Sequence, residues 1–289
     1  MDQAATLRKM TDIREVNAGT FNNIRVIAIT SGKGGVGKTN VVANLAIALS
    51  KLGKKVMILD ADLGLGNLDV LLGLTPKYNV QHLLMGEKGL SDIIVNGPSG
   101  IMILPSSSGV QELTSLTDEQ QLNLLTEFDK LPSKIDFFLI DTGAGISSNV
   151  IYFSTAAQEI IVIVSPEPTS ITDAYALMKV LSTKHAERKF KLLVNMIKDE
   201  REAKEVYRKL SIVADRFLNI SIDYIGYITL DNNMPKAVCR QKAIVDIYPN
   251  SQSSRAFDQL ARTICEWPAP LQPKSNIQFL WKRLIGAGS

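Results

Sequence analysis

The chain has 289 residues, of which 45% are hydrophobic and 21% are charged, values typical of an ordinary globular protein. Its 32 basic and 29 acidic side chains leave a net charge of +3, which is too small to favour a nucleic-acid-binding protein. With only Cys239 and Cys265 and no CxxC pair, a disulfide framework and a cysteine-built metal site are both disfavoured. No signal peptide and no membrane-spanning apolar run of roughly 20 residues is visible, so we expect a cytoplasmic protein.

Short β-rich runs alternate with longer helical patterns along the chain, as in a parallel sheet covered by helices. We expect strands at residues 24–30, 55–60, 101–105, 137–141, 159–165, 190–195 and 224–228. The clearest helices are expected at residues 38–52, 169–184, 199–217 and 251–266. Several strand runs, such as IRVIAIT, are almost continuously apolar, which suits strands buried on both faces. The pattern predicts one α/β domain over residues 24–266, with a mostly parallel, twisted sheet of seven or eight strands and helices on both faces.

Three further segments lie outside this alternation. Residues 1–23 are polar and mildly helical in pattern. Residues 267–275 contain three prolines and are typical of a stiff linker, because proline blocks regular structure. Residues 276–289 form a short tail.

A glycine-rich motif stands between the first expected strand and the first expected helix. It reads Gly32-Lys33-Gly34-Gly35-Val36-Gly37-Lys38-Thr39, followed by Asn40, and fits G-x-x-x-x-G-K-[ST] in its proper strand–helix context. Such glycines let backbone N–H groups turn towards phosphates at a helix N-terminus. We expect Lys38 to reach the β- and γ-phosphates and Thr39 to bind Mg²⁺, which predicts a P-loop NTPase that binds ATP or ADP. A glycine-rich turn without a ligand is the alternative.

Two acidic segments follow expected strands, where open α/β sheets place their ligand sites. The first is Asp60-Ala61-Asp62, and the second begins at Asp141. Asp62 or Asp141 could instead merely cap a following helix. No histidine or glutamate neighbours the motif in the sequence as a general base, which fits phosphoryl transfer by positioning and electrostatics.

Lys33 distinguishes this motif from a plain P-loop. The run KGGVGKT resembles the deviant Walker A motif of the MinD/ParA family of dimerising ATPases. The resemblance implies an ATP-dependent homodimer in which Lys33 reaches the partner's nucleotide, so that Lys33 acts in catalysis with Lys38 and Asp62. It also implies that Asp62 orients the attacking water near Mg²⁺ and that Asp141 binds Mg²⁺ through water. A solvated loop lysine is the alternative for Lys33.

The resemblance extends to a second switch and to a base-binding region, each with one departure. Gly143 stands where the family commonly has proline, which suggests a more flexible switch loop. Asn195 matches the family asparagine that hydrogen-bonds adenine, although it could instead be a strand-end turn residue. The loop packed on the ring would contain Ile228, Thr229 and Asp231, and Thr229 stands where many members carry proline.

The tail carries an apolar helical face beside basic residues. Its spacing of i, i+3, i+4, i+7 and i+8 places on one face Ile277, Leu280, Trp281, Leu284 and Ile285. Lys282 and Arg283 flank this face, which suits a helix lying on anionic lipid. It resembles the membrane-targeting sequence of MinD-type proteins, and it implies peripheral attachment to the inner face of the cell membrane in the ATP-bound state. A helix docked on the chain's own core is the alternative.

The N-terminal segment resembles a motif of the FlhG group of flagellar number regulators. Residues 2–8, DQAATLR, match the DQAxxLR activator motif of that group. The resemblance implies that Asp2, Gln3, Leu7 and Arg8 contact the flagellar GTPase FlhF, with Gln3 helping to order its attacking water. A disordered tail is the alternative. Flagellar C-ring proteins or a flagellar transcription regulator remain open as further partners.

Three other functions stay open at this point. A cell-division positioning protein is a near relative. A ParA-like partitioner should present a basic stripe for DNA, and the small basic excess argues against it. An iron–sulfur reductase needs cysteines near the switches, whereas Cys239 and Cys265 lie late in the chain. The most concrete prediction is an ATPase that switches between monomer and dimer and regulates flagellar number or placement.

Overall fold

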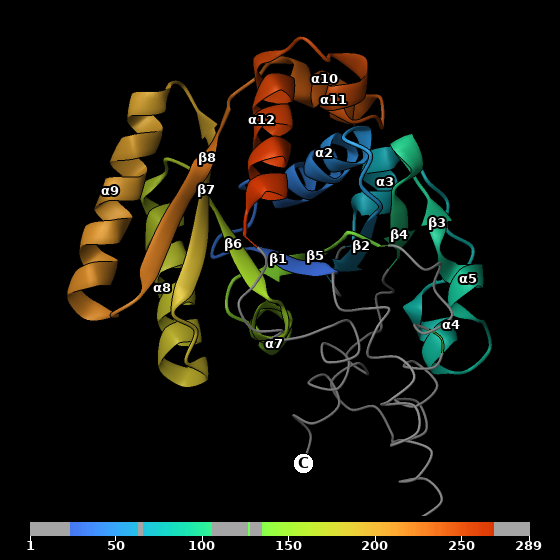
Figure 1. Ribbon diagram of the computed structural model, residues 1–289, viewed down its shortest axis with the longest axis horizontal. Coiled ribbons are helices and arrows are strands. Elements are labelled where there is room, and N and C mark those ends of the chain that lie inside the picture. Colours follow the sequence, from blue (N-terminus) through green and yellow to red (C-terminus); the bar gives the residue numbers. More distant parts are fainter. Residues whose placement is uncertain (1–23, 63–65, 106–126, 128–134, 269–289) are drawn as a thin grey trace, which may run out of the picture.

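An eight-stranded sheet forms the centre of the computed structural model, which describes residues 24–62, 66–105, 127 and 135–268 (Figure 1). The strand order is β3-β4-β2-β5-β1-β6-β7-β8, and every neighbouring pair is parallel except β3 and β4. The strands are β1 Arg25–Ser31, β2 Val56–Ala61, β3 Val95–Asn96, β4 Met102–Leu104, β5 Phe137–Ala144, β6 Glu159–Val164, β7 Lys189–Ile197 and β8 Ser221–Thr229. The prediction of a mostly parallel α/β sheet is confirmed.

Helices cover both faces of this sheet, as the apolar strand runs predicted. The α-helices are α2 Lys38–Lys51, α3 Leu68–Leu72, α4 Val80–Leu84, α5 Leu90–Ile93, α7 Ser148–Ala156, α8 Pro168–His185, α9 Glu200–Phe217, α10 Asn233–Cys239, α11 Ile244–Ile247 and α12 Gln252–Glu266, with a 3₁₀ turn at Pro98–Gly100. Alternate residues of β1 serve the two faces. Ile27 and Ile29 pack with α2, α11 and α12, whereas Val26 and Ala28 pack with the side that holds α4, α5 and α7.

The elements that the sequence did not predict are short. The strand β3 is a two-residue antiparallel addition at the sheet edge, held by the turn in which Gly97 N–H donates to Ile101 O at 2.8 Å. Helix α7 spans nine residues and is capped by Ser147, whose hydroxyl accepts from Val150 N–H at 3.4 Å. Elements of this length carry too few periods for their hydrophobic pattern to stand out.

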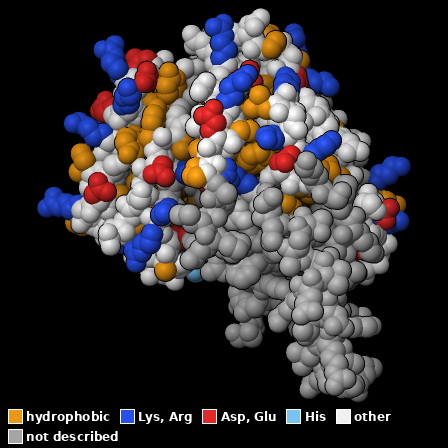
Figure 2. Space-filling model, viewed as in Figure 1, with side chains coloured by type: hydrophobic (Ala, Val, Ile, Leu, Met, Phe, Trp, Pro, Cys, Tyr) orange, Lys and Arg blue, Asp and Glu red, His pale blue; other side chains and the backbone are white. Residues whose placement is uncertain are grey.

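No helix of the described residues is long and apolar enough to cross a membrane. The expected activator residues of the N-terminal segment and the whole expected tail lie outside the described residues. Within the described surface, hydrophobic side chains gather over β8 between α9 and α12 (Figure 2). The residues lining the groove there include Ile225, Tyr227 and Leu260, with Arg255 on α12.

Candidate functional site

The glycine-rich motif forms a loop from the carboxyl end of β1 to the first turn of α2. Gly35 and Gly37 have φ values of 78° and 82°, in the left-handed region that favours glycine. A Cβ at Gly32 would lie 2.1 Å from the carbonyl carbon of Asp173, so a side chain has no room there. Helix α2 begins after Gly37 without a side-chain cap, which leaves its first N–H groups available to an anion.

A buried ion pair lies beneath this loop. The Nζ of Lys38 is 2.6 Å from Oδ1 of Asp141, and the two side chains are 8% and 1% exposed. Asp141 lies on β5, the strand next to β1, so the sheet itself brings the pair together. Burial raises the pKa of Asp141, while the Lys38 ammonium and the Thr39 hydroxyl act in the opposite direction. Thus the structure brings together Lys38, Thr39 and Asp141.

A second carboxylate, which the sequence reasoning passed over, lies beside Asp141. Asp60 is its register partner on β2 and is 4% exposed. Burial, followed by the nearby Asp141 charge, raises the pKa of Asp60 to about 7. The carboxylate accepts from Asp62 N–H at 3.2 Å and from Leu68 N–H at 3.4 Å, which ties β2 to the start of α3. Its position at a strand end was the available signal.

Asp62 lies at the mouth of the phosphate loop. It lines the same pocket as Gly34, Lys38 and Thr39. A Cβ at Gly143 would lie 3.4 Å from Oδ1 of Asp62, so a larger residue at 143 would stand against this carboxylate. The two expected switch segments therefore meet at this point.

Lys33 turns towards its own chain. Its Nζ pairs with the Glu167 carboxylate and donates to Oγ1 of Thr169 at 2.9 Å. Glu167, the residue before α8, thus lies beside the motif in space although 134 residues separate it from Lys33 in the sequence. The Lys33 side chain is 33% exposed and its Glu167 partner 60%, so solvent screens this pair.

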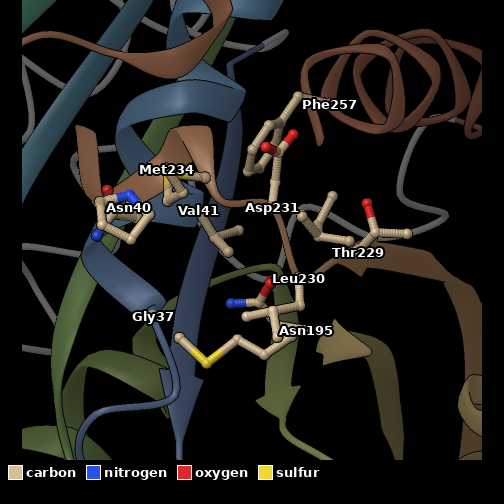
Figure 3. Close-up of a pocket in the computed structure, with 12 residues that line it drawn as sticks. Gly37, Asn40, Val41, Asn195, Thr229, Leu230, Asp231, Met234 and Phe257 are labelled. Carbon is tan, nitrogen blue, oxygen red and sulfur yellow. The ribbon is translucent and has the colours of Figure 1, made fainter. Parts of the chain in front are cut away.

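A second pocket adjoins the loop on the side of α2 and β8 (Figure 3). It brings together the sequence-predicted residues Gly37, Asn40, Asn195, Ile228, Thr229 and Asp231. The sequence reasoning missed its apolar walls, which come from Val41, Met196, Leu230, Met234, Pro235 and Phe257. Such walls suit a flat ring, and only the tertiary structure places them together.

Asn195 connects this pocket to the phosphate loop. Its side-chain nitrogen donates to Val36 O at 2.7 Å and lies on the side of Gly37 in Figure 3. Because the amide nitrogen is used in this way, the acceptor Oδ1 remains for a ligand. Asn195 is 6% exposed, so this contact with the loop is buried beneath it and shielded from solvent.

The donor set suits Mg²⁺ better than a metal caged by protein. Thr39, Asp62 and Asp141 offer oxygen atoms beside the phosphate loop, which is the chemistry that Mg²⁺ prefers. Among the described residues, no group of three or more His, Cys, Asp or Glu side chains is arranged to hold a metal alone. This fits a metal that is held partly by phosphate oxygens.

Comparisons with known proteins show the family to which the chain belongs. A family model described as an AAA domain matches residues 24–194. The antiactivator FleN of Pseudomonas aeruginosa is 44% identical over 92% of this chain and 95% of its own length. The flagellum site-determining protein YlxH of Helicobacter pylori is 34% identical over 98% of both chains. The chain belongs to the MinD/ParA-type ATPases.

A solved structure agrees with this assignment. The septum site-determining protein MinD of Pyrococcus horikoshii, crystallised with Mg-ADP, is 26% identical, with a TM-score of 0.67 over 84% of this chain and 96% of that one. The present chain thus shares its fold with a MinD/ParA-type ATPase that holds a nucleotide and magnesium. In the present chain, the phosphate loop, the two expected switch segments and the adjoining apolar pocket lie together at the carboxyl edge of the sheet.

Proposed function

We propose that the chain is a switch that binds ATP and Mg²⁺, dimerises in that state and returns to a monomer when it hydrolyses the nucleotide. The observation that supports this most is the buried Lys38–Asp141 pair under the phosphate loop. A phosphate anion in the loop offers Lys38 a second partner, so binding redistributes charge between the loop and the β5 switch. The chain is thereby able to convert the state of the nucleotide into a change at Asp141.

Each residue of the site has a role in this proposal. Glycine and α2 N–H groups hold the phosphates, and Lys38 reaches the terminal ones. Thr39, Asp62 and Asp141 would hold Mg²⁺, which neutralises phosphate charge when bound. Asp62 also orients the attacking water. Asn195, with Ile228, Thr229 and Asp231, would bind the base.

Lys33 supplies the dimer-dependent step. In the proposed dimer it leaves Glu167 and Thr169 and reaches the partner's nucleotide, where a second cation stabilises the transition state. Because the pair with Glu167 is solvent-exposed, breaking it costs little.

The two terminal segments extend the proposal to a cellular task. The tail that contains Trp281 would attach the ATP-bound dimer to an anionic membrane, and the segment that contains Gln3 would stimulate the flagellar GTPase FlhF. Support comes from the tail's amphipathic pattern, the DQAATLR sequence, and relatives named as a flagellum site-determining protein and an antiactivator. The proposed outcome is control of flagellar number or placement.

One experiment tests the switch itself. Lys33→Ala should reduce ATP hydrolysis at least about tenfold in the presence of anionic vesicles, since one stabilising cation is lost from the transition state. Nucleotide binding should stay within about twofold. Lys51→Ala, which alters a lysine remote from the loop, is the matched control. Hydrolysis that stays the same in Lys33→Ala would contradict a trans-acting lysine.

The proposed stimulation of the flagellar GTPase is tested separately. A peptide of residues 1–23 should raise GTP hydrolysis by the flagellar GTPase, and Gln3→Ala in that peptide should remove the effect. No stimulation by the unaltered peptide would leave the ATPase switch standing and refute the activator role. A role in division-site positioning is the second candidate, supported by the likeness to MinD, and it requires no effect of the N-terminal segment on that GTPase.

A further inference from the structure

The described chain begins and ends at the same point of the molecule. Arg25 opens β1, one residue after the described chain begins. Its guanidinium donates to Ile264 O at 3.0 Å, to Trp267 O at 3.3 Å and to Pro268 O. Since Pro268 is the last described residue, one side chain spans both ends. The segments 1–23 and 269–289 therefore connect to the domain side by side.

We call the point where Arg25 meets Pro268 the exit, and side chains of neighbouring strands hold it in place. Nε of Arg25 lies 3.0 Å from Oε2 of Glu159 on β6, and the two side chains are 10% and 14% exposed. Lys191 on β7 stands 3.7 Å from the same carboxylate and 4.0 Å from the centre of the Trp267 ring. A largely buried ion pair and a cation–π contact thus hold Trp267 in place, so the domain fixes the point to which residues 269–289 are attached.

The exit lies at the opposite edge of the sheet from the nucleotide site. In a parallel sheet the strands all begin at one edge and end at the other, and the phosphate loop follows the end of β1. Seven residues of strand separate the two edges by about 23 Å. A surface bound at the exit edge would therefore leave the nucleotide site and Lys33 uncovered.

Basic side chains flank the exit on both sides. Lys54 and Lys55 precede β2, while Arg188 and Lys189 stand at the start of β7, and all but the half-buried Lys54 are exposed. The strand order places β5, β1 and β6 between these two pairs, so they stand roughly 19 Å apart with the exit between them. Lys54 is close enough to α12 for its charge to act on the pKa of Cys265.

The carboxylates of this edge are partly engaged elsewhere. Asp136 accepts from Lys55 N–H at 2.7 Å, and Asp223 lies 3.8 Å from Nζ of Lys191. Glu187 is buried, and Glu266 is exposed beside the exit. Arg188 donates to Leu218 O, at the C-cap of α9, at 3.3 Å, a role that needs no binding partner. An experiment must therefore distinguish basic side chains that only stabilise the fold from basic side chains that bind a surface.

We propose that this edge of the sheet is a membrane-facing surface that binds an anionic bilayer together with the tail. The inference rests on the proposed lipid-binding function of the tail and adds the domain's own contact surface to it. Each cation held near an anionic bilayer strengthens attachment about fivefold. Because the N-terminal segment leaves from the same edge, it is presented at the membrane, and its partner meets it there.

The test compares two double charge reversals in the full chain. Lys55→Glu with Lys189→Glu alters one cation on each side of the exit. Lys204→Glu with Lys209→Glu makes the same change in net charge on α9, where both lysines are exposed and paired with glutamates of their own helix. Binding with ATP is measured on phosphatidylcholine vesicles with and without phosphatidylglycerol, over a series of salt concentrations. Thermal unfolding and ADP binding show that both variants are folded.

The exit-edge variant should bind the anionic vesicles at least about 25-fold more weakly, with a shallower salt dependence, while the α9 variant stays within about threefold. Equal losses in both variants, or no loss at the exit edge, would overturn the inference while the tail's role stands. Failure of the unaltered chain to bind anionic vesicles would overturn the tail's role and the inference together. Binding to duplex DNA is measured in parallel. If the exit-edge variant loses DNA binding but keeps vesicle binding, the edge belongs to nucleic acid and the inference is overturned.

Discussion

The loop that we propose for the phosphates and the apolar pocket that we propose for the base, here the phosphate half and the base half, are built in different ways. The phosphate half is polar and strongly constrained, with a buried lysine–aspartate pair, a second buried carboxylate and a glycine whose backbone touches α8. The base half is an apolar pocket with Asn195 as its link to the loop. The contrast shows that neighbouring parts of one sheet edge rest on different interactions, buried charges in the phosphate half and apolar packing in the base half.

The constraint in the phosphate half has a thermodynamic consequence. Buried charges are stable only with their partners, so any change that removes one partner affects folding as well as binding. The apolar walls of the base half lose only packing when altered. Substitutions should therefore separate the two halves by the size of their effect on unfolding.

The largest effect is expected from Lys38→Met. This change keeps the side chain's volume but leaves Asp141 buried without its cation, at a cost of about 3–5 kcal/mol in the free energy of unfolding. Urea unfolding at neutral pH measures the cost, and a fluorescent ADP analogue should show lost binding. Lys51→Met is the control, because its pair with Asp246 is 39% and 25% exposed and is worth less than about 1 kcal/mol. Equal costs would contradict a special role for the buried pair.

The next largest effect concerns Asp60 and pH. Its pKa is raised from 3.8 to about 7, so between these values the folded state holds a proton that the unfolded state releases. The free energy of unfolding should therefore fall as pH rises through this window, by at most about 4 kcal/mol for a shift of this size. Asp60→Asn should reduce this slope and be more stable than the unaltered chain at pH about 8. The measurement is urea unfolding without Mg²⁺ across the pH range, and an unchanged slope would refute it.

A smaller effect is expected from Gly32→Ala. Its Cβ would lie 2.1–2.5 Å from backbone atoms of Asp173 and Ala174, so α8 must shift, at a cost of about 1–3 kcal/mol. Gly34→Ala is the matched control in the same loop, because its Cβ meets no atom within 4 Å and its φ is not positive. Thermal unfolding of the two variants gives the comparison. A similar loss in both would mean that loop flexibility, rather than contact with α8, requires glycine at position 32.

The same contrast explains what the sequence could predict. The phosphate loop follows from a contiguous motif in its strand–helix context. Short apolar runs predicted every strand except β3, and the longer helical patterns between them predicted the four long helices. Pairing across strands could not be read in this way. Lys38 meets Asp141 across 103 residues, and Lys33 meets Glu167 across 134, so only the strand order places them together.

The base pocket shows the limit most clearly. Asn195 was predicted from the family resemblance, but the wall residues Met234 and Phe257 come from elements with no shared motif. The strand β7 runs on to Ile197, with Met196 at a φ of 60°, and its pairing with β8 shifts register between Val194 and Ile197. An apolar run does not predict such an irregularity, because the residues around it follow the same pattern.

The smallest effect should come from the base half and bear on specificity. Asn195→Ala removes the donor to Val36 O and the acceptor that faces the pocket, and it should weaken ADP binding about tenfold. Thr229→Val is the control: it keeps the shape of a side chain that the proposal places against the base, and within the described residues it removes only a hydroxyl without a hydrogen-bond partner, so ADP binding should change less than about twofold. Titration with ADP and GDP checks both.

The same amide bears on base specificity. Because its nitrogen is bound to Val36 O, its oxygen is left to accept from the base, so the unaltered chain should prefer adenine, whose amino group donates, over guanine, whose carbonyl does not. An Asn195→Ala variant that keeps this preference in full would assign the specificity to the apolar walls instead.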